Sequence, residues 1–356
     1  MSVPTQIPPF PAKALLEWYN MYKRDLPWRE TNDPYVIWIS EIVLQQTRVD
    51  QGLPYFERIL EAFPTIHDLA KAPEDAVLKL WEGLGYYSRA RNLHFTAKLV
   101  SDELGGHFPK TYHGLLELKG VGPYTAAAIG SMAFNLPTAA VDGNVYRVLA
   151  RFGGIHSSID ETATKQVIAE FADHIIDNSK PGDHNQAMME LGATVCTPSN
   201  PQCHDCPLKE NCVAHQHGTQ HILPLRSKKT KVRDRFFYYK VVLMNDTVLI
   251  NKRPSGDIWQ GLYEFPLYES EKRLSDNEMV GLLTIKKTDS VLSISKEYKH
   301  VLSHQRIFTK FLLVKSDSFD DSNFIRVEVE KVDNFAFPKL INRYLDDQNL
   351  KVLSDD

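Results

Sequence analysis

Two glycines, separated by one residue and followed by a proline, lie between two apolar stretches of helical period. The segment is Gly120-Val121-Gly122-Pro123. The glycines permit a tight turn with close approach of the backbone, and proline suits the first turn of a helix. A helix that begins there has unpaired backbone N–H groups, which suit a phosphate. We therefore predict two helices joined by an anion-binding hairpin at Gly120 and Gly122.

The hairpin lies in a long region whose apolar residues recur with helical spacing and show no strand-like alternation. The expected helices span residues 14–22, 36–47, 54–62, 73–81, 88–104, 115–118, 124–134, 145–152, 163–173 and 185–196. Many short helices of this kind indicate a mainly α domain, which we place at residues 1–215.

From residue 236 the pattern becomes that of an α+β domain, which we place at residues 236–356. The expected elements are strands at 236–244 and 247–251 around Asn245-Asp246, strands at 291–295, 300–309 and 311–315, and a helix at 338–345. Two domains suit a chain of 356 residues. The basic stretch between them, 216–235, is either a solvated linker or a strap that contacts phosphates.

All four cysteines of the chain lie within one short stretch. They are Cys196, Cys203, Cys206 and Cys212, separated by six, two and five residues. Four thiols this close together, in a chain with no visible secretory signal, indicate a metal site rather than disulfides. Four thiolates suit either tetrahedral zinc or a four-iron cluster, and the spacing by itself leaves both open.

Two acidic residues are candidates for catalysis. Glu41 is the one acid in the apolar stretch 35–48, where burial would raise its pKa and let it act as a general acid. It could instead lie at a helix surface or pair with Arg48. Asp142 follows the hairpin helix and could be the N-cap of the next helix, a carboxylate for chemistry, or both. Cleavage of a glycosidic bond uses one acid and one carboxylate in this way.

The hairpin, Asp142 and the cysteine spacing together resemble the helix-hairpin-helix DNA glycosylase superfamily that contains endonuclease III, and in particular its MutY-type adenine DNA glycosylases. The resemblance implies that the cysteine loop, residues 196–212, holds a [4Fe–4S] cluster. In lyase members a lysine nucleophile stands two residues after the second glycine. This chain has Tyr124 there. The resemblance therefore implies a monofunctional enzyme that forms no Schiff base.

The same resemblance assigns roles in the catalytic domain. Glu41 would protonate adenine at N7, and Asp142 would stabilise or capture the sugar cation. Tyr124 and Asn144 would position the sugar, the water and Asp142. Trp28 and Arg29 would line the adenine pocket, although a turn anchored in the core would explain them equally well.

Removal of a base from duplex DNA requires that the base be flipped out, with protein side chains filling the gap. Two stretches resemble the family's loops for this task. Their matching positions are Gln46, Thr47, Leu84 and Tyr86. Leu84 and Tyr86 could equally be core residues, but the glycines beside them favour a loop.

The second domain resembles a Nudix-type sheet around residues 258–266. Residues 267–284 lack the glutamate array of Nudix hydrolases, so we expect no pyrophosphatase activity. Ser303 and His304 match a family loop that recognises 8-oxoguanine. Leu302 stands where that loop usually has phenylalanine, which leaves the placement of the polar contacts less certain.

We therefore expect an adenine DNA glycosylase that acts on double-stranded DNA with adenine opposite 8-oxoguanine or guanine. It would act as a monomer in the cytoplasm, at the nucleoid, without a membrane. A net charge of −4 excludes a protein that coats DNA through bulk charge. The alternatives are a thymine or uracil mismatch glycosylase, a lesion-binding protein without chemistry, and a Nudix hydrolase fused to a helical binder. Two acids favour chemistry over binding alone.

Overall fold

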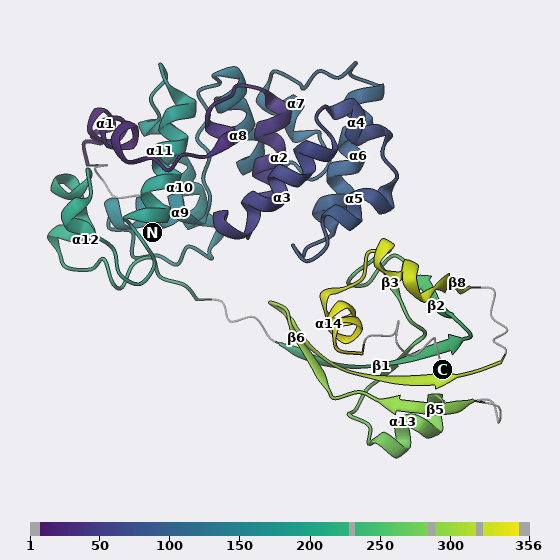
Figure 1. Cartoon of the computed structure of the whole chain (residues 1–356). Coiled ribbons are helices and arrows are strands. Elements are labelled where there is room, and N and C mark those ends of the chain that lie inside the picture. Colours follow the sequence, from purple (N-terminus) through teal and green to yellow (C-terminus); the bar gives the residue numbers. More distant parts are fainter. Residues whose placement is uncertain (1–7, 228–231, 284–288, 318–322, 349–356) are drawn as a thin grey trace. The chain divides into compact units, whose positions relative to one another are not determined.

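The computed structural model describes residues 8–227, 232–283, 289–317 and 323–348. These residues form two compact units, which we call the helical unit and the sheet unit (Figure 1). The helical unit contains residues 8–71 and 92–227, and the sheet unit contains residues 72–91 and the described residues from 232 onward. Segment 72–91, which the sequence placed in the helical domain, therefore belongs to the sheet unit.

The helical unit consists of α-helices and short 3₁₀ turns. They are α1 (Ala12–Tyr22), η1 (Pro27–Arg29), α2 (Pro34–Leu44), α3 (Val49–Ala62), α4 (Ile66–Lys71), α7 (Tyr112–Leu116), α8 (Pro123–Phe134), α9 (Gly143–Phe152), α10 (Thr162–Ile175), α11 (Pro181–Thr194), η2 (Cys203–Asp205), η3 (Lys209–Asn211) and α12 (Val213–Gln216). Helix α6 (Ser88–Asp102) crosses the boundary between the units at Arg91. The expected mainly α architecture is confirmed.

The predicted hairpin joins α7 to α8. Gly120 adopts φ +84°, a left-handed conformation that favours glycine. Gly122 is different, because its φ is −93° and it serves as the N-cap of α8, with Pro123 as the first helical residue. Only Gly120 therefore needs glycine for the turn itself. The hydroxyl of Thr96 donates to the carbonyl of Lys119 at 2.8 Å and fixes the hairpin to α6.

Four helices of this unit share one apolar core. Leu15 of α1, Leu149 of α9, Ile168 of α10 and Leu191 of α11 are each fully buried in it. Asp142 caps α9, so this core also fixes the position of that carboxylate. Helix α2 ends at Leu44 rather than extending to residue 47 as expected, because Gln46 adopts φ +55° and turns the chain.

The sheet unit combines one mixed sheet with helices. Its elements are α5 (Glu74–Leu80), β1 (Arg233–Met244), β2 (Thr247–Lys252), β3 (Tyr263–Glu264), β4 (Leu267–Ser270), α13 (Asp276–Leu283), β5 (Ser290–Ile294), β6 (Tyr298–Val301), β7 (Gln305–Lys315), β8 (Ile325–Glu328), η4 (Val329–Asn334) and α14 (Lys339–Gln348). Within the described residues the strand order is β3-β2-β1-β7-β5, with β4 beside β1, β6 beside β7 and β8 beside β2.

Alternation along β1 explains how the sheet is covered on both faces. Phe237 and Tyr239 face one core, where Phe311 stacks on Tyr344 of α14 with ring centroids 3.9 Å apart. Tyr238 and Val242 face the other core, which includes residues of α13. The centre of the sheet is the parallel pair β1 and β7, in register from Arg233 with Gln305 to Leu243 with Lys315.

The expected hairpin of β1 and β2 is confirmed, since Leu243 pairs with Val248 across the turn. The expected strand at 300–309 is wrong as one element. Residues 298–301 form β6, which turns back onto β7, and Leu302 N–H donates to the carbonyl of Gln305 at 2.8 Å. Ser303 and His304 are thus at the tip of a hairpin rather than within a strand.

Candidate active site

Glu41 lies on α2 in a setting that keeps its proton near neutral pH. Asp33 caps the helix by accepting from the N–H of Tyr35 at 2.9 Å, and Pro34 opens the first turn. The apolar faces of α2 then bury Glu41 to 7% exposure. Burial raises its pKa to about 7; a hydrogen bond from Tyr124 opposes the shift, and the charge of Asp142 adds to it. Tyr124, rather than Arg48, is thus the partner of this carboxyl.

Asp142 is the N-cap of α9, which is one of the roles that the sequence suggested for it. One carboxylate oxygen accepts from the N–H groups of Asn144 and Val145 at 2.9 and 2.8 Å. The other accepts from the side-chain amide of Asn144 at 2.7 Å. Burial raises the pKa of Asp142, and these three donors oppose that shift. The capping bonds hold the carboxylate in one orientation, so the cap and a chemical role are compatible.

Both acids line one cavity of about 150 Å³. Tyr124 interacts with both of them: its hydroxyl forms a hydrogen bond with Glu41, feels the charge of Asp142 and lies 3.2 Å from the sulfur of Met189. Burial and the charges of the two acids raise the pKa of Tyr124 well above its usual value, so it stays neutral. The cavity is also lined by several residues expected from the sequence, namely Trp28, Arg29, Thr47 and Asn144.

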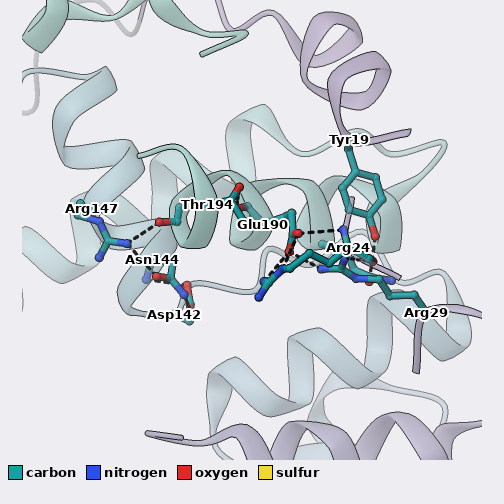
Figure 2. A network of polar contacts seen from close by, with 10 residues as sticks. Tyr19, Arg24, Arg29, Asp142, Asn144, Arg147, Glu190 and Thr194 are labelled. Carbon is teal, nitrogen blue, oxygen red and sulfur yellow. Dashed lines mark hydrogen bonds and ion pairs between the residues drawn. The ribbon is translucent and has the colours of Figure 1, made fainter. Parts of the chain in front are cut away.

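The cavity is also lined by an ion-pair network around Glu190 that the sequence did not predict (Figure 2). Glu190 of α11 is fully buried and accepts from Arg24 through both carboxylate oxygens, at 2.8 Å each. Arg29 donates to the same carboxylate at 2.6 Å. Burial alone would raise the pKa of Glu190, but the bonds from the two arginines outweigh it and hold the pKa at about 2.

Gln186, one helical turn before Glu190, extends this network. Its side-chain oxygen accepts from the hydroxyl of Tyr19 and from Arg29, both at 3.0 Å. A signal for Glu190 was present in the sequence: it is an acid within the apolar run Ala187-Met188-Met189-Glu190-Leu191, the criterion that selected Glu41. Its two arginine partners lie more than 150 residues away, and although Arg29 was expected at the pocket, nothing in the sequence indicated its pairing with Glu190.

Two arginines on α9 connect this region to the cysteine loop. Arg147 donates to the side-chain oxygen of Asn144 at 2.8 Å and to the carbonyl of Cys196 at 2.7 Å. Figure 2 shows Arg147 beside Asn144 and Asp142. One turn later, Arg151 is 2% exposed and donates to the carbonyl of Thr197 at 2.7 Å and to the sulfur of Cys196 at 3.3 Å.

The four cysteines form no disulfide and line one cavity. Burial, together with the negative charge of the neighbouring sulfurs, raises the pKa of Cys206 to about 12. A bound metal centre takes cysteine as the thiolate, so binding at this site releases the thiol protons. Four cysteine sulfurs lining one cavity supply the donor set that a [4Fe–4S] cluster takes. When bound, the cluster cross-links the loop through these four residues.

The residues expected to hold the opened DNA differ in exposure. Gln46 is exposed, while Thr47 lines the catalytic cavity. In the sheet unit, Tyr86 is 50% exposed with φ +49°, whereas Leu84 is 6% exposed. Of these two residues, only Tyr86 projects from the surface. Leu84 is a core residue in this structure, which was the alternative interpretation of its position.

A second cavity, of about 280 Å³, lies within the sheet unit. One wall consists of residues 86–88 and 91, and the other contains Trp259, Leu302, Ser303 and His304. Ser303 and His304 are exposed, and their side chains lie 3.3 Å apart between hydroxyl oxygen and ring nitrogen. Leu302 also packs against the sheet core, so the missing phenylalanine leaves an apolar anchor in place.

Comparison with known proteins matches three parts of the chain. Residues 39–174 match the HhH-GPD superfamily of base excision DNA repair proteins, residues 196–212 the iron–sulfur binding domain of endonuclease III, and residues 238–347 the NUDIX domain. An adenine DNA glycosylase of Buchnera aphidicola (strain Bp) is 33% identical over 87% of this chain and 88% of its own length. The chain belongs to the adenine DNA glycosylase family. It is accordingly a DNA N-glycosylase of base excision repair, and it carries a [4Fe–4S] cluster.

Longer relatives match over less of their length. The rat adenine DNA glycosylase is 48% identical over 57% of this chain, which spans 41% of that protein, and the human one is 46% identical with 40% spanned. Among solved structures, a thermostable thymine-DNA glycosylase is similar with a TM-score of 0.53 and 31% identity, over 58% of this chain and 95% of its own. An endonuclease III–DNA complex has a TM-score of 0.50 and 25% identity, over 62% of this chain and 100% of its own.

The structure also bears on membrane association. Among the described residues, no helix is both long and apolar enough to cross a membrane.

Proposed function

We propose that this adenine DNA glycosylase excises adenine paired with 8-oxoguanine, or with guanine, and leaves an abasic site in an intact strand. The observation that carries the proposal is the single cavity that holds a carboxyl of raised pKa, Glu41, and the triply hydrogen-bonded carboxylate of Asp142. Two carboxyl groups in different environments supply the acid and the anion that the cleavage of a glycosidic bond needs.

Glu41 donates its proton to N7 of the flipped adenine, which makes the base a better leaving group. The bond between C1′ and N9 breaks, and its electron pair leaves with the base. Asp142 stabilises the cationic sugar, held in place by the N–H groups at the start of α9. A water oxygen then bonds to C1′, and the proton of that water is released.

The arginine network gives the cavity a fixed shape for the base. Glu190 accepts N–H groups from Arg24 and Arg29 and so immobilises two planar guanidinium groups at the wall. Arg29 and Trp28 border the space where adenine would sit. The two fixed guanidinium groups give this wall a flat, cationic surface, which suits the acceptor nitrogens of a purine ring.

The absence of a nearby amine supports a monofunctional reaction. Among the described residues that line the cavity there is no lysine, and Tyr124 occupies the position after the hairpin. A Schiff base with the sugar therefore has no nucleophile at this site.

In the sheet unit, Ser303 and His304 are the residues that would bind the base opposite adenine. 8-Oxoguanine differs from guanine in its oxygen at C8 and in the hydrogen on N7. A hydroxyl and an imidazole at a hairpin tip can donate to the oxygen and accept from that hydrogen. A single chain therefore supplies the groups for both tasks.

The test is single-turnover excision from a duplex with one adenine opposite 8-oxoguanine, followed by alkali to reveal abasic sites. Wild type should yield breaks only after alkali, and Glu41→Gln should lose at least about 100-fold in rate. Asp142→Asn, which retains an N-cap residue, should lose activity while remaining folded. Breaks without alkali would overturn the monofunctional assignment. Excision of thymine from a G·T duplex in place of adenine would support another target base, and tight binding without excision would support a lesion-binding protein.

A further inference from the structure

Segment 72–91 carries the loop that ends at Tyr86, and side chains along it bond with distant parts of the sheet unit. At the start of α5, Asp75 accepts from the hydroxyl of Tyr263 at 2.9 Å and from the ammonium of Lys252. At the far end, Arg91 donates to the carbonyl of Gln260 at 2.5 Å. The loop is thus bracketed by contacts with β2, β3 and the turn that precedes β3.

The central contact involves Glu82, which immediately precedes Gly83. One carboxylate oxygen of Glu82 accepts from the backbone N–H of Phe337 at 2.8 Å. The other accepts from Lys79 at 2.6 Å, and Lys79 also donates to the carbonyl of Phe335 at 3.1 Å. The Glu82 side chain is only 17% exposed. A charge-assisted bond in this setting is stronger than one at the open surface.

From Glu82 onward, short-range bonds fix the loop. The hydroxyl of Tyr87 accepts from the N–H of Gly83 at 3.1 Å, and the indole of Trp81 donates to the carbonyl of Gly85 at 3.0 Å. The guanidinium of Arg89 lies over the rings of Trp81 and Tyr86, at 5.1 and 5.7 Å. Because the loop is internally braced, its anchor at Glu82 sets where Tyr86 stands.

Tyr86 stands at the cavity of about 280 Å³ described above, opposite Trp259, Ser303 and His304. We propose that Glu82 is a positioning residue that fastens the Gly83–Tyr86 loop to the backbone at Phe335–Phe337. The loop and the Ser303–His304 hairpin tip are then held rigidly together when they contact one base pair. In this way Glu82 strengthens the preference for 8-oxoguanine over guanine. This inference rests on the proposed function.

The experiment compares Glu82→Ala, Glu82→Gln and the control Lys252→Gln in the full chain. Two quantities are measured: the single-turnover rate of adenine excision opposite 8-oxoguanine relative to that opposite guanine, and hydrogen exchange of the amides at 83–87. Glu82→Ala should lower the rate ratio roughly tenfold or more, the effect of losing one charge-assisted bond, and should speed exchange in the loop. Glu82→Gln keeps an acceptor for Phe337 N–H and should recover most of the ratio. Lys252 is 40% exposed, and its loss should change little.

A Glu82→Ala protein that slows excision equally from both duplexes, or that leaves the rate ratio and loop exchange unchanged, would overturn the proposal. So would a Lys252→Gln protein as impaired as Glu82→Ala. If Glu82→Ala unfolds, Glu82→Asp provides the test, because it keeps the charge but shortens the reach to Phe337 and should lower the ratio in the same direction. Wild type that excises no adenine from either duplex would refute the proposed function instead, and loop exchange would still decide whether Glu82 holds the loop.

Discussion

Among single residues, two carboxyl groups that line the same cavity differ in their surroundings. Glu41 is buried on an apolar helix and has a pKa of about 7, whereas Asp142 is fixed by three donors at the start of α9. Glu190, in the same cavity, has a pKa of about 2 because two arginines outweigh its burial. The pKa values of the three acids are thus shifted differently, because their neighbours rather than their residue type determine the shift.

The ionisation of Glu41 makes both rate and stability depend on pH. Because the acid form of Glu41 is the donor in the proposed mechanism, the excision rate should fall about tenfold per pH unit above a pH of about 7. The folded pKa exceeds the ordinary value of 4.5, so the unfolded chain loses this proton first. Stability should therefore decrease as pH rises from 4.5 to 7, with the full cost, about 3 kcal/mol, present above 7.

Glu41→Gln removes that cost and is the matched control. Urea unfolding at a series of pH values should show the variant to be more stable than wild type at pH 8, with the difference narrowing as pH falls towards 4.5. A difference that stays constant with pH would show that Glu41 keeps an ordinary pKa in the folded protein.

At the scale of elements, the hairpin between α7 and α8 shows that two glycines of one motif have different reasons to be glycine. Gly120 has φ +84°, and an added Cβ would meet Asn92 Cβ at 2.8 Å. Gly122 has an ordinary φ, and an added Cβ would enter open space. The first is required by the turn, while the second leaves room in front of the first N–H groups of α8.

This difference yields a paired prediction. Gly120→Ala should lower the unfolding free energy by about 1 to 2 kcal/mol or more, because it combines left-handed strain with a clash. Gly122→Ala should stay within about 0.5 kcal/mol of wild type but weaken binding to duplex DNA several-fold, since its methyl group would obstruct a phosphate. Urea titration and fluorescence anisotropy measure the two quantities. Equal loss of stability in both variants, or undiminished DNA binding by Gly122→Ala, would contradict the assignment.

At the scale of the whole molecule, the two units have separate apolar cores. The helical core involves α1, α9, α10 and α11, and the cores of the sheet unit lie on the two faces of β1 and β7. The cysteine loop is held by Arg147 and Arg151 and so belongs to the helical unit alone. Loss of the cluster should consequently follow the unfolding of the helical unit and not that of the sheet unit.

Unfolding in urea should accordingly proceed in two transitions. The visible absorbance of the cluster should follow the helical unit, and hydrogen exchange of β1 and β7 amides should follow the sheet unit, with different midpoints. Coincident midpoints for the two probes would instead show that the units unfold as one cooperative structure.

Features whose geometry depends on neighbours in the chain can be predicted from the amino-acid sequence. A glycine hairpin before a helix, four cysteines within 17 residues, a lone acid in an apolar helix and period-two strands around Asn245-Asp246 are local patterns, and backbone sterics or hydrogen bonding convert each into structure directly. The hairpin, the helices around it and the β1–β2 turn were therefore predicted before the fold was known.

Contacts between groups that are distant in the sequence depend on how the elements pack. Glu190 meets Arg24 across 166 positions of sequence, and Glu82 meets Phe337 across 255. Such contacts arise from the packing of whole helices and sheets, and side-chain charge alone does not specify a partner. For the same reason the strand expected at 300–309 was divided by a turn, and segment 72–91 joined the sheet unit: packing against partners far along the chain settled both.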